Sequence, residues 1–125
     1  MTARNPEGVH STLEDALNRH DLDAFVAAFE EDATAIAPLD GQVVHGRNEI
    51  RDATAPIMAM KPNARIEVVG KVEGDGLAVT HARWTVAGID PDGNALEIAG
   101  RGTIVSRRQP DGSWLIVLEN PLTPV

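Results

Sequence analysis

The Asp-Gly dipeptide, which occurs four times in this chain, constrains the fold more than any other feature of the sequence. Asp-Gly favours the turns with positive φ angles that join neighbouring antiparallel strands. Three of the four copies lie in the second half, between segments rich in β-branched and apolar residues. We therefore predict a meander of long hairpins, and we interpret the four aspartates as turn residues rather than catalytic acids. The strands are expected at residues 65–73, 77–89, 96–108 and 113–120.

The first half of the chain shows helical periodicity instead. Apolar residues recur every three or four positions over residues 6–19, as they do along one face of a helix. A second helix is expected after Asp21, whose side chain can cap it, and a third is expected to begin at Gly46. Short strands are expected between these two helices, at residues 33–39 and 42–45. Three helices and a meander predict an α+β fold, with the helices covering one face of the sheet.

Length and composition narrow the range of functions. The chain has 125 residues, so residues 1–125 are expected to form a single domain. Nineteen acidic and eleven basic side chains give a net charge of −8, whereas binding to nucleic acid needs clustered Lys and Arg. The lack of cysteine excludes disulfides and thiol nucleophiles. No apolar run is long enough to span a membrane, and no leader-like segment is recognised. We expect a cytoplasmic protein that binds neither nucleic acid nor membranes.

Four short motifs resemble those of one superfamily. The segment DLDAFVAAFEEDAT (residues 21–34) is similar to the second helix and first strand of NTF2-like proteins, which include SnoaL-like polyketide cyclases and ketosteroid isomerases. HGRNEIR (residues 45–51) and RQPDGSW (residues 108–114) resemble the opening of the third helix and the last hairpin. The closing ENP (residues 119–121) is most similar to the YybH-like or DUF4440-like branch. The resemblance covers about residues 9–121.

This resemblance implies a cone-shaped α+β fold, in which three helices from the N-terminal half pack on a strongly curved, mostly antiparallel mixed sheet. The sheet wraps around a pocket, and such proteins are usually homodimers. Ketosteroid isomerases need a carboxylate base, a tyrosine and a protonated acid in that pocket. The resemblance places these three roles at Ala37, Leu13 and Ile104, none of which can carry a proton. We therefore do not expect ketosteroid isomerase chemistry.

Strand alternation indicates which side chains of the long strands face the pocket. Ala82 and Trp84 lie on the more apolar face of their strand, so we place them inward. Trp84 then either forms a flat wall against a ligand or fills the core. The outer face is expected to form the homodimer contact, and the alternative is a set of cross-strand pairs in solvent. That outer set consists of His81, Arg83, Arg101 and Thr103.

The last strand is apolar on both faces, and the resemblance favours the face of Leu115, Val117 and Glu119 for the pocket. Glu119 is then the one candidate acid–base group. A carboxylate among apolar side chains is poorly solvated, which raises its pKa and suits it to proton transfer. The alternative is a strand-end residue paired with an arginine or with water. The four histidines lack the spacing of metal ligands, and we expect no metal and no cofactor.

Two functions remain open. The first is a pocket that binds a small, largely apolar metabolite, with cofactor-independent acid–base chemistry of the isomerase, cyclase, dehydratase or hydrolase type. The second is a non-catalytic dimerisation or docking module. A catalytic pocket predicts an open cavity in which Glu119 has a hydrogen-bond partner, whereas a docking module predicts a filled cone. The residues expected to line the pocket are Leu13, Leu17, Ala37, Thr54, Met58, Ala82, Trp84, Ile104, Leu115 and Val117.

Overall fold

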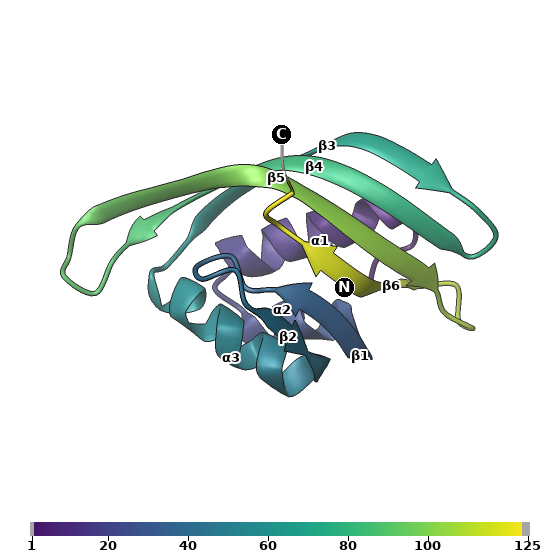
Figure 1. The fold of residues 1–125 in the computed structure, drawn as a ribbon, viewed down its shortest axis with the longest axis horizontal. Helices are drawn as coiled ribbons and strands as arrows, with labels where there is room; N and C mark the ends of the chain where they lie inside the picture. The colour runs from purple at the N-terminus through teal and green to yellow at the C-terminus, as the bar shows by residue number, and fades with distance from the viewer. Residues whose placement is uncertain (1, 124–125) are drawn as a thin grey trace.

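The computed structural model describes residues 2–123, in which three helices lie beneath a curved sheet (Figure 1). None of the helices in this range is both long enough and apolar enough to cross a membrane. In chain order the elements are α1 (Pro6–Asn18), α2 (Leu22–Ala27), β1 (Phe29–Ile36), β2 (Val43–His45), α3 (Gly46–Ala59), β3 (Asn63–Glu73), β4 (Leu77–Ile89), β5 (Ala95–Arg108) and β6 (Trp114–Asn120).

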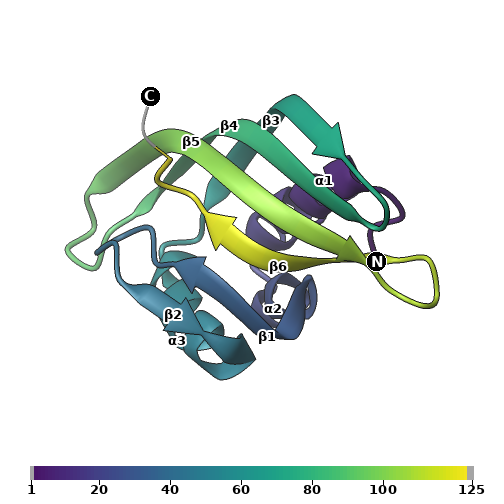
Figure 2. The ribbon, with the colours of Figure 1, turned by 45° about the vertical axis from the view of Figure 1, so that its right-hand side comes forward.

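Within the described range, the sheet has six strands in the order β2-β1-β6-β5-β4-β3. Neighbouring strands are antiparallel except for β1 and β6, which run parallel. Because β6 lies between β1 and β5, it joins the first half of the chain to the meander, as Figure 2 shows. The predicted α+β fold, with three helices on a curved mixed sheet, is confirmed.

The Asp-Gly segments form turns, as their sequence predicts. In the three hairpins of the meander, Gly76, Gly93 and Gly112 have φ angles of 72°, 85° and 85°, a region that favours glycine. In the β4–β5 turn, Oδ1 of Asp90 accepts hydrogen bonds from the backbone amides of Asp92 and Asn94 at 2.9 and 2.8 Å. The Asp90 and Asp111 carboxylates therefore hold backbone amides of their own turns.

The boundary between α2 and β1 differs from the prediction. The helical spacing of apolar residues extends to Phe29, but α2 ends at Ala27 and Phe29 begins the strand. The carbonyl of Phe29 accepts a hydrogen bond from Nε of Arg47 at 2.9 Å. The carbonyl of Ala28 accepts one from the amide of Ile116 at 2.9 Å. These contacts with distant segments occupy the backbone groups that a longer helix would use, so the strand begins earlier than the local pattern indicates.

Helix α1 covers the edge of the sheet at β3. The side chain of Asn18 accepts a hydrogen bond from the amide of Ala64 at 2.6 Å and donates one to its carbonyl at 3.1 Å. Oε2 of Glu14 accepts a hydrogen bond from the amide of Ile66 at 2.7 Å. An edge strand otherwise leaves such backbone groups unpaired. These bonds hold the helix under the curved sheet and close one side of the enclosed space.

Replacing Asn18 with Ala tests this closure. The variant loses both side-chain bonds to Ala64, and we expect the free energy of unfolding to fall by about 1–3 kcal/mol. Urea denaturation followed by circular dichroism measures the change. Asn48→Ala, at an exposed position on α3, serves as the control. An equal loss in both variants would contradict a specific role for Asn18 at the edge.

Candidate functional site

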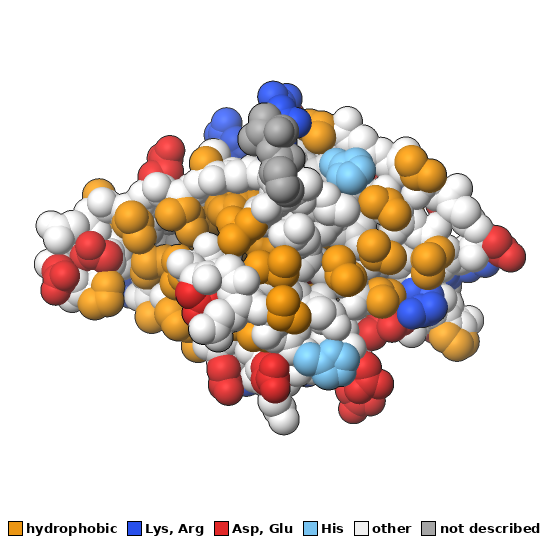
Figure 3. Space-filling model, in the orientation of Figure 1, with side chains coloured by type: hydrophobic (Ala, Val, Ile, Leu, Met, Phe, Trp, Pro, Cys, Tyr) orange, Lys and Arg blue, Asp and Glu red, His pale blue; other side chains and the backbone are white. Residues whose placement is uncertain are grey.

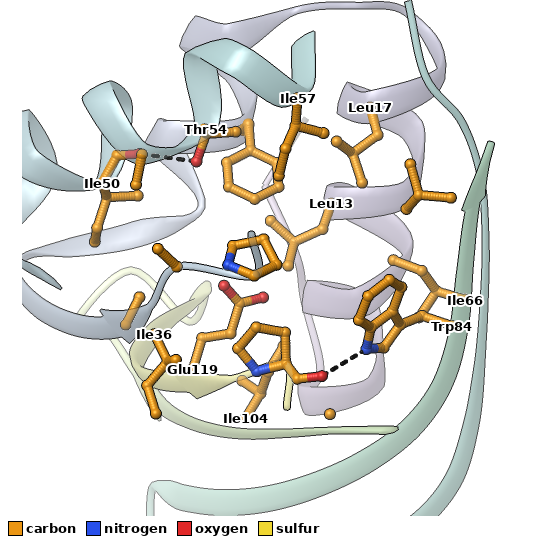
Figure 4. Close-up of a pocket in the computed structure, with 18 of the residues that line it drawn as sticks. Leu13, Leu17, Ile36, Ile50, Thr54, Ile57, Ile66, Trp84, Ile104 and Glu119 are labelled. Atoms are coloured by element: carbon orange, nitrogen blue, oxygen red, sulfur yellow. Dashed lines mark hydrogen bonds between the residues drawn. The ribbon is translucent and has the colours of Figure 1, made fainter. Parts of the chain in front are cut away.

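The helices and the inner face of the sheet enclose a cavity of about 90 Å³ (Figure 4). Every element from α1 to β6 contributes to its wall, and nearly all the side chains in the wall are apolar. The wall residues are His10, Leu13, Leu17, Phe25, Ala35, Ile36, Ala37, Pro38, Val44, Ile50, Ala53, Thr54, Ile57, Ile66, Ala82, Trp84, Val86, Ile98, Gly102, Ile104, Glu119 and Pro121.

Most of the residues that the sequence places in the pocket lie in this wall. Leu13 and Leu17 come from α1 and Thr54 comes from α3, while Ala37 follows β1. Ala82, Trp84 and Ile104 come from the long strands β4 and β5. The cone is therefore not filled, although several of these side chains also belong to the hydrophobic core.

The structure also places the two arginines that the sequence analysis assigns to the outer face of the sheet. Arg83 and Arg101 alternate with cavity residues along β4 and β5, and they pair directly across the two strands. Both side chains are exposed, and Arg83 forms an ion pair with Glu67 at 2.8 Å. They lie on the outer face of the sheet together with His81 and Thr103, which share a hydrogen bond of 3.1 Å. No arginine therefore reaches the cavity wall.

Glu119 lies near the end of β6 with its carboxyl group inside the cavity, as Figure 4 shows. Its neighbours across the sheet are Ala35 on β1 and Ile104 on β5. Burial alone raises the pKa of Glu119 to about 7, with no contribution from a charge or a hydrogen bond. A carboxylate in this position is poorly solvated and has no partner, so its protonated form is favoured up to neutral pH.

The lack of a hydrogen-bond partner differs from the expectation for a catalytic pocket. The neighbouring indole of Trp84 does not supply one, because its Nε1 donates to the carbonyl of Pro121 at 2.9 Å (Figure 4). The alternative of an arginine pair also fails, since both candidate arginines are on the outer face. Glu119 therefore faces the cavity with its hydrogen-bonding capacity unused within residues 2–123.

Leu115 and Val117 do not line the cavity, contrary to the prediction. The prediction assumed strict alternation along β6, but a β-bulge interrupts the pairing of β5 with β6. Ser106 pairs with Ile116 and Val105 pairs with Leu118, so Val117 is an extra residue. Ile116 is therefore inward before the bulge and Glu119 is inward after it. The prediction counted alternate residues back from Glu119 through the bulge, and it therefore assigned Leu115 to the inner face of the sheet incorrectly.

Met58 is the third predicted pocket residue that lies outside the wall. Helix α3 directs Ile50, Thr54 and Ile57 at the cavity. Met58 follows Ile57 by one residue, which is a rotation of about 100° around the helix. It packs against the core from a half-buried position instead.

His10 is a cavity residue that the sequence reasoning missed. Its side chain is only 3% exposed, and its Nε2 lies 2.6 Å from Oγ1 of Thr80 on β4. Burial lowers the pKa of His10 to about 4, so the imidazole is neutral at pH 7. The helical periodicity of the sequence indicates this position. His10 precedes Leu13 by three residues and Leu17 by seven, so it lies on the same apolar stripe of the helix.

Pro121 was also missed as a wall residue, and two glycines explain how it fits. A Cβ atom at Gly100 would lie 2.9 Å from the ring of Trp84 and 3.3 Å from the carbonyl oxygen of Pro121. At Gly102 a Cβ atom would contact Cα of Pro121 at 3.5 Å. The glycines in β5 therefore make room for the indole and for the segment that follows β6.

The described residues contain no group of three or more His, Asp or Glu side chains placed to hold a metal ion. The polar groups of the wall are one carboxyl, one neutral imidazole and the hydroxyl of Thr54, which donates to the carbonyl of Ile50 at 2.8 Å. The arrangement can therefore bind an apolar molecule and exchange one proton with it through Glu119.

Several solved structures share this fold at low sequence identity. An NTF2-like superfamily protein from Salmonella enterica has a TM-score of 0.80 at 16% identity, over 94% of this chain and 87% of that one. A ketosteroid isomerase-like protein from Erwinia carotovora has a TM-score of 0.78 at 17% identity, over 94% of each chain. A Xanthomonas campestris protein named for the calcium/calmodulin dependent protein kinase II association domain has a TM-score of 0.77 at 20% identity, over 95% and 86%.

At these identities the likeness shows the fold alone. No curated protein matches the sequence. The family model of the SnoaL-like domain, however, matches residues 9–117, which is most of the chain. This match agrees with the helices beneath a curved sheet and with the cavity between them. The chain therefore belongs to the SnoaL-like domain family.

Proposed function

We propose that the cavity binds a small, largely apolar metabolite and that Glu119 transfers a proton to or from it without a cofactor. The observation that carries the proposal is a carboxyl group that faces an apolar cavity; it lacks the protein partner expected of a catalytic group, and a bound ligand would supply that partner. A structural carboxylate would have an arginine or backbone amides as partners, because burying an unpaired charge is costly. A proton-transfer group, in contrast, needs a free oxygen directed at the ligand.

The pKa of Glu119, raised to about 7 by burial, suits this role. Near neutral pH both forms are populated, so the group can remove a proton from one bound molecule or donate one to another. The Trp84 N–H is already bonded to Pro121, and the hydroxyl of Thr54 to Ile50. The described wall thus offers one proton-transfer group without a ready oxyanion hole. This disfavours any reaction that must stabilise a full oxyanion, such as ester hydrolysis or isomerisation through an enolate.

The size of the cavity limits the ligand. About 90 Å³ is less than the roughly 150 Å³ of an apolar protein cavity known to hold benzene. A ring-sized ligand must therefore extend toward the surface or displace wall side chains. Hydrophobic side chains gather on the surface between the β4–β5 hairpin and the loop after β1 (Figure 3). Exposed Leu39, Ile89 and Leu96 belong to these two segments.

A Kemp elimination assay tests the base directly, with 5-nitrobenzisoxazole as the probe. A carboxylate removes the proton from C3 of the ring, and the electron pair breaks the N–O bond to give a coloured nitrophenolate. We expect a rate above buffer that rises with pH around a midpoint near 7, since the ionised form of Glu119 is the base. Glu119→Gln should lower the rate on the order of 100-fold or more.

Glu31→Gln is the matched control, because it makes the same chemical change at an exposed position on β1. It should leave the elimination rate unchanged. Equal rates for the wild type and Glu119→Gln would eliminate the acid–base role and leave the non-catalytic alternative.

The pH dependence of stability tests whether Glu119 is buried without a partner. Its pKa is about 7 when folded and 4.5 when unfolded, so between these values the unfolded chain ionises first. Stability is therefore fully present below pH 4.5 and is lost as pH rises toward 7, by at most about 3 kcal/mol. Urea unfolding from pH 4.5 to 8 should show the wild type losing stability relative to Glu119→Gln. A difference that stays constant over this range would show that the carboxyl is solvated.

We also propose that the protein is a homodimer that associates through the outer face of the sheet. Arg83 and Arg101 lie directly opposite each other there, and Arg101 forms no ion pair among the described residues. Like charges in direct opposition destabilise a sheet unless another group compensates them. Glu67 already compensates Arg83, whereas Arg101 would be covered by a second copy that packs on this face about a two-fold axis.

Sedimentation at micromolar concentration measures this association. We expect a species of twice the mass of one chain, and Thr103→Arg, which places a bulky charge in the middle of the outer face, should yield the monomer. Circular dichroism checks that the variant remains folded. A wild-type protein that sediments as a monomer would refute the proposed dimer.

A further inference from the structure

The charge distribution of the cavity and its surroundings indicates which ligands fit. Among the wall residues Glu119 is the only side chain that carries a charge near neutral pH. The second titratable group, His10 on α1, is neutral because burial lowers its pKa to about 4. The residues that α2, α3 and strands β1 to β5 contribute to the wall have no titratable side chain. An anionic ligand would therefore meet a carboxylate with no cation to offset the repulsion.

Two segments that contribute residues to the cavity wall are acidic as well. The loop and strand over residues 37–45 and the hairpin over residues 85–100 contain no Lys or Arg. They carry four carboxylates, at Asp40, Asp90, Asp92 and Glu97. Ala37, Pro38, Val86 and Ile98 of the same two segments belong to the cavity wall. A cleft bordered by charges of one sign concentrates ligands of the opposite sign.

The indole of Trp84 is a third feature of the cavity wall that favours a cationic ligand. Its N–H is bonded to the carbonyl of Pro121, so the indole presents its ring system rather than a donor to the cavity. The face of an indole attracts an organic cation electrostatically. The indole and the Glu119 carboxyl both lie in the wall of the one cavity, as Figure 4 shows.

We infer, building on the proposed binding role of the cavity, that its ligand is a compact apolar amine whose ammonium group pairs with the carboxylate of Glu119. The hydrocarbon part lies against the aliphatic wall, and the ammonium supplies the partner that the carboxylate lacks. A bound cation favours the ionised carboxylate, so the pair forms without leaving either charge alone in the cavity. The amine thereby holds Glu119 in its basic form.

Three matched probes separate charge from shape: cyclopentylamine, cyclopentanol and cyclopentanecarboxylate. Methyl NMR spectra of the wild-type protein, titrated with each probe, report binding through the Leu13, Ile57 and Ile104 signals of the wall. At pH 8 we expect the amine to bind at least fivefold more tightly than the alcohol, and the carboxylate to bind more weakly than both. Between pH 8 and pH 6 the affinity for the amine should fall about tenfold, because Glu119 with a pKa near 7 becomes protonated.

Glu119→Gln should remove the preference for the amine and its pH dependence, while Glu31→Gln should retain both. A second measurement does not depend on a variant: in the wild type, the amine should lower the titration midpoint of the Glu119 carboxyl carbon, and the alcohol should not. Equal affinities for amine and alcohol, or loss of the preference in Glu31→Gln, would overturn the amine inference. Binding of the alcohol alone would leave the proposed pocket function in place, whereas no binding of any probe would overturn both.

Discussion

The pairing of β6 with β1 on one side and β5 on the other is the constraint on which the site depends. The β1–β6 pairing is the parallel one in an otherwise antiparallel sheet. Together with the β5–β6 pairing, it joins the helical half of the chain to the meander. Within it, Glu119 has Ala35 and Ile104 as its neighbours. The carboxyl is thereby placed between small and aliphatic side chains in the wall of the apolar cavity. Its raised pKa is thus a consequence of strand order.

Much of the fold follows from local signals in the sequence. The Asp-Gly turns and the apolar stripes of α1 and α3 depend on neighbouring residues, so the order of the elements is predictable. The boundary of α2 is not, because contacts of the Phe29 and Ala28 carbonyls with Arg47 and Ile116 decide it. Both contacts join segments that are distant in the sequence, and no local pattern reports them.

The same division applies to the site. Alternation correctly separates Trp84 from Arg83 on β4, because that strand pairs with β5 in an unbroken register. It fails for Leu115 on β6, where a bulge shifts the phase of the strand. His10 was missed for a different reason: its position on the α1 stripe was visible, but a histidine is more often judged as a ligand or a surface group than as a wall residue.

Glu119 and His10 respond to the same environment in opposite ways. Burial raises the pKa of the acid and lowers that of the base, so both groups favour their neutral forms inside the cavity. Folding stability linked to Glu119 is lost as pH rises from 4.5 to about 7, while stability linked to His10 is lost as pH falls from 6.5 to about 4. The two dependences oppose each other where they overlap, which flattens the pH profile of the folded state.

The bond between Trp84 and the Pro121 carbonyl has a consequence for ligand exchange. Pro121 follows the last strand and forms part of the wall, and the indole N–H holds it there through one hydrogen bond. Thr123 fastens the same segment to the outer side of the sheet, through its amide to the carbonyl of Arg101 and through its hydroxyl to Thr103. Residues 121–123 thus connect the cavity wall to the outer face of the sheet, so a ligand that displaces Pro121 would also disturb the bonds of Thr123 to Arg101 and Thr103.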